Sequence, residues 1–88
     1  MKKIEVSVVV PVYNASLNLK KLVEDLFEVF KSNFNTYELI LVNDKSLDDS
    51  WSIITNLCKS YSWIKGIELR KNVGQHNAIL AGLKYTEG

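Results

Sequence analysis

The sequence predicts a three-layer α/β fold in which a parallel sheet lies between two layers of helices. Two runs, residues 6–10 and 37–42, are almost continuously apolar and rich in β-branched side chains, as in strands buried on both faces. The expected strands begin at Val6, Tyr37 and about Ile64, and separations of 31 and 27 positions match the length of a strand–helix unit. The predicted order is therefore strand, helix, strand, helix, strand, helix.

The first strand is expected to end at Pro11, because proline has no N–H to donate to a sheet ladder. Apolar residues then recur at spacings of three and four, which predicts a helix of about four turns with one apolar face. That face comprises Leu19, Leu22, Val23, Leu26, Phe27 and Phe30. The helix is expected to end at Asn33 and Asn35.

The second strand, 37–42, leads into a polar segment and a second helix. Ser46 and Asp49 have the spacing of a capping box, which predicts a helix start near Leu47. The apolar face of this helix comprises Trp51, Ile54, Leu57, Cys58 and Tyr61. Trp51 and Phe27 are interpreted as core residues rather than as stacking platforms for a ligand.

The third strand, Ile64–Leu69, is weaker, and the last helix is expected over Gln75–Tyr85. Ala78 and Gly82 lie four positions apart on this helix, so they share one of its faces. Their small size predicts close packing of the helix on the sheet.

Composition excludes several classes of protein. With 88 residues the chain is at most one domain, and its net charge of +1 argues against binding nucleic acid through bulk charge. The longest apolar stretch, Val8–Tyr13, is far short of the ~20 residues that span a bilayer. Residues 1–3 are followed by no signal-peptide core, and the single Cys58 suits a reducing, cytoplasmic compartment.

The small size also limits stability, because a chain of this length buries only about 60–65% of its unfolded surface. Either a partner covers part of the core, or the chain is a piece of a larger protein. Exposed sheet edges make a homodimer of the chain possible.

Ligands of open parallel sheets bind outside the carboxyl ends of the strands. The polar residues that follow the three expected strands are Asn14, Ser16, Asn43, Asp44, Lys45, Ser46, Arg70, Lys71 and Asn72. An acid there could accept the N–H of a pyrimidine base, and cations and helix N-termini could hold a diphosphate. Hydrogen bonds to a charged group are worth roughly 1.5–3 kcal/mol each, so Asp44 is the strongest specificity candidate.

Structural interpretations compete with these assignments. Ser46, Asp48 and Asp49 suit a helix start in any protein. Asn14 suits a turn because asparagine tolerates left-handed conformations. Lys71 and its neighbours could be solvated loop charges, and His76 could be structural. The sequence contains no G-x-G-x-x-G, P-loop, Cys/His metal spacing or nucleophile elbow.

Three motifs resemble those of family 2 glycosyltransferases, which have the GT-A fold. Residues 8–14, followed by Asn18, resemble the opening of that family, and residues 42–50 resemble its second, acidic motif. Residues 72–78 with Gly82 resemble its third helix. The Gly-Gln-His sequence of the third motif is most similar to the branch that loads sugars onto polyprenyl phosphates. Together the three motifs cover essentially the whole chain.

The resemblance implies that residues 1–88 are the Rossmann-like, N-terminal half of a GT-A domain. The intact enzyme would transfer a sugar from a nucleotide-sugar donor, of the UDP type, to polyprenyl phosphate or a glycan at the cytoplasmic membrane face. Pro11, Tyr13 and Asp44 match positions that hold the base and ribose, and Lys71 and Gly74 lie near the ribose and diphosphate. Together with the rim residues, the predicted nucleotide-binding set is Pro11, Tyr13, Asn14, Asp44, Ser46, Lys71, Gly74 and His76.

The family's D-x-D motif, which coordinates Mg²⁺ or Mn²⁺ on the diphosphate, follows the third helix and is expected after Gly88, as is any catalytic base. The 88 residues alone are therefore expected to bind no metal and to show no measurable transfer. Lys45 stands where the family usually has glycine, which leaves the form of that turn open. Ala15 and Ser16 stand where it often has glutamate, which leaves the choice of donor open.

Two alternatives from other classes remain at this point. A flavodoxin-like or receiver-type module would bind without catalysis, but receivers need acids at the first and third strand ends. A structural α/β fragment would bind nothing.

Overall fold

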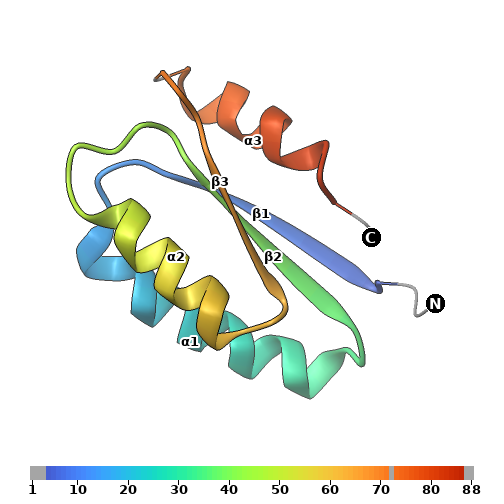
Figure 1. Ribbon diagram of the computed structural model, residues 1–88. Helices are drawn as coiled ribbons and strands as arrows, with labels where there is room; N and C mark the ends of the chain where they lie inside the picture. The colour runs from blue at the N-terminus through green and yellow to red at the C-terminus, as the bar shows by residue number, and fades with distance from the viewer. Residues whose placement is uncertain (1–3, 72, 87–88) are drawn as a thin grey trace.

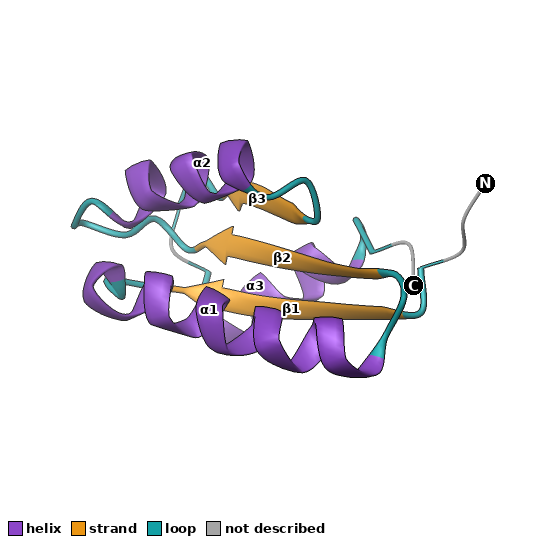
Figure 2. Cartoon of the chain, turned by 90° about the horizontal axis from the view of Figure 1, so that it is seen from below, coloured by secondary structure: helices purple, strands orange, loops and turns teal. Residues whose placement is uncertain are grey.

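The computed structural model describes residues 4–71 and 73–86, and it contains one parallel sheet. The strands are β1 (Val6–Val12), β2 (Tyr37–Asn43) and β3 (Ile64–Glu68), with β2 in the centre. All three strands run in the same direction (Figure 2). Their carboxyl ends therefore meet at one edge of the sheet.

The helices cover both faces of this sheet. They are α1 (Ser16–Asn33), α2 (Ser50–Ser60) and α3 (Gln75–Leu83). Helices α1 and α2 lie on one face and α3 lies on the other (Figure 1). The observed order of elements and the three layers confirm the predicted fold class.

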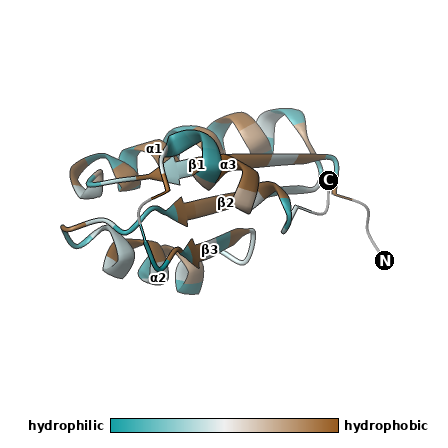
Figure 3. Cartoon of the chain, turned by 90° about the horizontal axis from the view of Figure 1, so that it is seen from above, coloured by the Kyte–Doolittle hydropathy of each residue, from teal (hydrophilic) through white to brown (hydrophobic). Residues whose placement is uncertain are grey.

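The alternation of side chains along β2 explains why this strand is apolar throughout. Leu39 and Leu41 join the core under α1 and α2, whereas Ile40 and Val42 join the core under α3. All four side chains are fully buried. Figure 3 shows the hydrophobic colour along β2, as expected for a strand with helices on both faces.

Aromatic rings hold α1 against the amino-terminal ends of the strands. The Trp63 ring stacks on Phe27 at a centroid distance of 5.7 Å and meets Phe30 edge-on, also at 5.7 Å. Trp51 packs against the same core. The expectation that Trp51 and Phe27 serve packing is consistent with these contacts.

Pro11 does not end β1, as the sequence analysis expects, but pairs with Val42 inside the strand. The Val12 carbonyl accepts the Asp44 N–H at 2.8 Å, so the backbone of Val12 faces β2. The nitrogen of the preceding residue, Pro11, therefore faces the other side of β1, where the described sheet has no further strand. A proline is tolerated there because no ladder bond is lost.

Helix α3 packs close to the sheet through its two small residues, as predicted. Ala78 is fully buried, and a Cβ atom added to Gly82 would meet the side chains of Val9 and Val42. Within residues 4–71 and 73–86, no helix is long and apolar enough to cross a membrane.

Candidate functional site

A cleft of ≈ 600 Å³ opens at the carboxyl ends of the strands. It is lined by Pro11, Tyr13, Ala15, Asp44, Gly74 and Gln75. These residues come from β1, the loop after it, the end of β2 and the start of α3. The structure thus brings together four residues of the predicted nucleotide-binding set: Pro11, Tyr13, Asp44 and Gly74.

Asp44 is the acidic residue of this cleft, and it is 3% exposed. Its carboxylate accepts the backbone N–H of Val73 at 2.8 Å and the N–H of Gly74 at 3.0 Å. Hydrogen bonds to an ionised acceptor are roughly twice as strong as neutral ones, and a negative charge is favourable at a helix N-terminus. The carboxylate therefore holds the loop before α3 at the wall of the cleft.

Gly74 makes this arrangement possible because of its backbone conformation. It precedes the first residue of α3 with φ of 87° and ψ of 156°, a region that side-chain-bearing residues rarely adopt. Its N–H points to Asp44. The family resemblance implies that Gly74 lies near the ligand, but no sequence pattern predicts its bond to Asp44.

Asn14 and Ser46 do not line the cleft but join the loops after β1 and β2. The Asn14 N–H donates to Ser46 Oγ at 3.0 Å, and the Leu47 N–H donates to Asn14 Oδ1 at 2.7 Å. Asn14 has a φ of 50°, as expected for a turn residue. The Ser46 hydroxyl in turn donates to Asn43 Oδ1.

These bonds explain why the predicted capping box is wrong. Helix α2 starts at Ser50, not near Leu47, and Asp49 at its N-cap makes no side-chain capping bond. Since the Ser46 hydroxyl bridges Asn14 and Asn43, it is not used to cap the helix.

Asp48 and Ser50 are structural parts of this rim. The sequence predicts Asp48 only as a helix-start residue, and it indicates no separate role for Ser50. Asp48 Oδ2 accepts the Ser16 N–H at 3.2 Å, and its Oδ1 accepts the Ser50 N–H at 3.0 Å. The Ser50 hydroxyl donates to the same carboxylate and accepts the Ala15 N–H at 3.2 Å. These bonds, the Ser50 hydroxyl first among them, lower the pKa of Asp48 from 3.8 to about 2.

This pKa predicts an acid dependence of stability. Because the folded pKa lies below the unfolded one, the contribution of Asp48 is fully present above pH 3.8 and is lost as the pH falls toward about 2. The difference in unfolding free energy between the unchanged chain and Asp48→Asn should shrink between pH 6 and pH 2 in urea titrations. A difference that stays constant over this range would contradict the assignment.

Lys45 also has a left-handed backbone, with a φ of 50°, so the turn keeps the shape that suits glycine. Left-handed conformation costs a residue with a Cβ atom roughly 1–2 kcal/mol, whereas the extra chain entropy of glycine costs roughly 0.5–1 kcal/mol. Lys45→Gly should therefore stabilise the chain by about 0.5–1 kcal/mol in urea unfolding. Lys45→Ala removes the same charge but keeps the strain, and equal effects of the two variants would contradict this account.

The remaining predicted residues lie at the rim without lining the cleft. Lys71 and His76 are exposed, before and within the start of α3. Asn72 lies outside the described residues. Ala15 and Gln75 line the cleft although they are not in the predicted set. The signals that could have found them are the 72–78 motif, which contains Gln75, and the family's frequent glutamate at the position of Ala15.

The metal that the family resemblance implies has no matching donor set among the residues that the structure describes. No group of three or more His, Cys, Asp or Glu side chains there could hold an ion. Asp44 is instead engaged with the backbone before α3.

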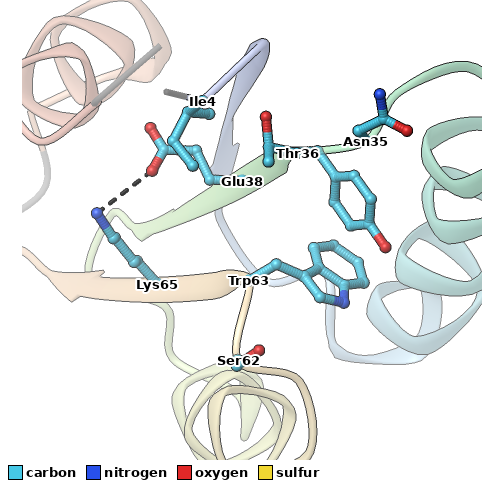
Figure 4. A pocket seen from close by; sticks show the side chains of 8 residues that line it. Ile4, Asn35, Thr36, Glu38, Ser62, Trp63 and Lys65 are labelled. Atoms are coloured by element: carbon cyan, nitrogen blue, oxygen red, sulfur yellow. Dashed lines mark ion pairs between the residues drawn. The ribbon is translucent and has the colours of Figure 1, made fainter. Parts of the chain in front are cut away.

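A second cleft, of ≈ 350 Å³, lies at the opposite edge of the sheet, at the start of β2 and β3 (Figure 4). There Glu38, 3% exposed, accepts the Ser7 hydroxyl at 2.6 Å and pairs with Lys65 at 3.3 Å. The charge of Glu38 is thus balanced by Lys65 within the protein. Glu38 precedes Asp44 by six residues along the strand, so this second cleft lies roughly 20 Å from Asp44. It is not at the strand ends where ligands of parallel sheets bind.

Comparison with known proteins adds a family match. The model of the family described as "Glycosyl transferase family 2" matches residues 7–88. An undecaprenyl-phosphate 4-deoxy-4-formamido-L-arabinose transferase of Shewanella sediminis (strain HAW-EB3) is 40% identical over 84 residues, which is 94% of this chain and 25% of that protein. The chain thus spans about a quarter of the length of this relative.

Solved structures share the fold. A mannosyltransferase of Pyrobaculum calidifontis, PcManGT, in complex with GDP-Man and Mn²⁺, superposes with a TM-score of 0.83 at 18% identity. That match covers 98% of this chain and 25% of the other. Residues 1–349 of S. aureus TarS superpose with a TM-score of 0.79 at 26% identity, over 97% of this chain and 25% of the other.

Proposed function

Because the chain belongs to glycosyl transferase family 2, we propose that it supplies the donor-binding part of an enzyme that transfers a sugar from a nucleotide. The observation that carries this proposal is the cleft in which Pro11, Tyr13, Asp44 and Gly74 meet at the carboxyl ends of the strands.

The chemistry of the cleft suits a uridine-type donor. The Asp44 carboxylate can accept the N–H of a pyrimidine base, while the half-exposed ring of Tyr13 offers an apolar face to the base or ribose. Gln75 and the N-terminus of α3 provide donors for a diphosphate. Lys71 and His76, exposed beside this helix start, are proposed to contact the same part of the donor.

The receiver-type alternative gains no support from the cleft. Asp44 is the acid among its lining residues, and β1 and the start of α3 contribute Pro11, Tyr13, Gly74 and Gln75. The lining of this cleft therefore lacks the acids that a receiver needs at its first and third strand ends.

The proposed acceptor is polyprenyl phosphate at the cytoplasmic face of a membrane. Support comes from the relative of Shewanella sediminis, whose name gives undecaprenyl phosphate as its lipid. The proposed metal is Mg²⁺ or Mn²⁺, the latter being present in the complex of PcManGT. A divalent ion would neutralise charge on the diphosphate.

Calorimetric titration with UDP, CDP and GDP tests the donor assignment. UDP should bind most tightly, and Asp44→Asn should weaken UDP at least about tenfold, the lower end for a charged hydrogen bond. Leu83→Ala, an exposed α3 position outside the cleft, is the matched control and should leave UDP binding unchanged. Failure of all three nucleotides to bind, or an unaltered UDP affinity in Asp44→Asn, would contradict the proposal.

A further inference from the structure

The start of α1 is held by side chains from a different loop. Three successive backbone N–H groups, those of Asn14, Ala15 and Ser16, each donate to a side-chain oxygen of residues 46–50, which lead from β2 into the first residue of α2. The acceptors are Ser46 Oγ at 3.0 Å, Ser50 Oγ at 3.2 Å and Asp48 Oδ2 at 3.2 Å. The two loops lie side by side in Figures 1 and 2.

The local sequence of α1 offers no substitute for these bonds. Ala15 stands at the N-cap and makes no side-chain capping bond, and the first turn contains no acidic residue. The first N–H groups of a helix have no partner within the helix, so they need a side chain, water or a ligand. Asp48 supplies both the acceptor and the negative charge that suits a helix N-terminus.

The same bonds determine where the wall of the cleft lies. Tyr13 and Ala15 both line the cleft. Ala15 is one of the three residues whose N–H groups are anchored, and Tyr13 directly precedes them. Ser50 is fully buried and links Asp48 to the loop after β1, because its hydroxyl donates to Asp48 and accepts the Ala15 N–H. A shift of Asp48 would therefore move Ser50 and the loop after β1 together.

We propose that Asp48, acting through Ser50, is a positioning residue for donor binding, which holds Tyr13 and Ala15 at the wall of the cleft. The proposal rests on the proposed function, since it names what this loop is positioned for. Asp48 is not among the residues lining the cleft, so its effect on the donor is indirect.

Asp49 provides a matched control. It is the adjacent residue, carries the same charge and is exposed, but it makes no side-chain capping bond to α2. A general effect of negative charge near the cleft would appear in Asp48→Ala and Asp49→Ala alike, whereas positioning predicts an effect only in the former.

Amide hydrogen exchange without nucleotide tests the anchoring. In Asp48→Ala and Ser50→Ala, the Ala15 and Ser16 amides should exchange about tenfold faster than in the unchanged chain, and in Asp49→Ala they should not. Unaltered exchange in Asp48→Ala would overturn the proposal. If Asp48→Ala does not fold, Asp48→Asn gives the same test, because its side chain keeps one oxygen as an acceptor. Its Ala15 and Ser16 amides should exchange faster than in the unchanged chain but more slowly than expected for Asp48→Ala.

UDP calorimetry on the same variants tests the link to the donor. Asp48→Ala and Ser50→Ala should weaken UDP about tenfold, Asp48→Asn should recover part of that loss, and Asp49→Ala should bind normally. Normal UDP binding in Asp48→Ala with faster exchange would overturn the positioning role alone. Absence of UDP binding in the unchanged chain would instead overturn the proposed function, and the donor role of Asp48 with it.

Discussion

Asp44→Ala should lower the unfolding free energy by about 3–6 kcal/mol, because two hydrogen bonds to a charged acceptor, each worth roughly 1.5–3 kcal/mol, are lost at once. The carboxylate is 3% exposed and binds the N–H groups of Val73 and Gly74 at 2.8 and 3.0 Å. Alanine would leave both N–H groups without this acceptor and would free the loop before α3. Urea unfolding followed by circular dichroism measures the loss.

The matched control for this prediction is Asp49→Ala, which removes an exposed carboxylate that makes no capping bond. Its effect should stay within about 0.5 kcal/mol, as for surface substitutions in general. If Asp44→Ala cost no more than this control, the carboxylate would not be what closes the loop before α3.

Gly82→Val should cost about 3 kcal/mol, because no space exists for a side chain between α3 and the sheet. A Cβ atom at this position would lie 2.8 Å from Val42 Cγ2 and would also overlap the side chain of Val9. Helix propensity favours alanine over glycine by up to about 1 kcal/mol, so Gly82→Ala should show a smaller net loss. Valine adds more volume and gains less in helix propensity than alanine does, which makes it the sharper test.

Leu80→Ala is the control for the packing of α3. Leu80 lies on the same helix but is 48% exposed, so its truncation should change the unfolding free energy by less than about 0.5 kcal/mol. A stability of Gly82→Val equal to that of Leu80→Ala would show that α3 does not pack on Val9 and Val42.

The fold could be predicted because its signals are periodic and local. The apolar run of β2 predicts a strand with helices on both faces, and Leu39 and Ile40 indeed enter opposite cores. Ala78 and Gly82 predict the close approach of α3. The position of Pro11 inside β1 is not predictable in this way, because it depends on which side of the strand is paired.

The candidate site could be predicted in part, for the same reason. Parallel strands bring their carboxyl ends together, which is why Pro11, Tyr13 and Asp44 meet in one cleft. Hydrogen bonds between loops cannot be inferred from local patterns. The Ser46 hydroxyl suits a helix cap by sequence, yet its partner is Asn14, 32 positions away, and Asp48 binds Ser16 at the same separation.

If the proposed function is correct, a nucleotide occupies the cleft at the carboxyl ends of the strands. Titration of the isotope-labelled chain with UDP, followed by the backbone amide resonances, tests it most directly. Saturable shifts should appear at Tyr13, Ala15, Gly74 and Gln75, with the amides around Glu38 unchanged. Absence of shifts at saturating UDP, or shifts confined to the opposite cleft at Glu38, would contradict the claim.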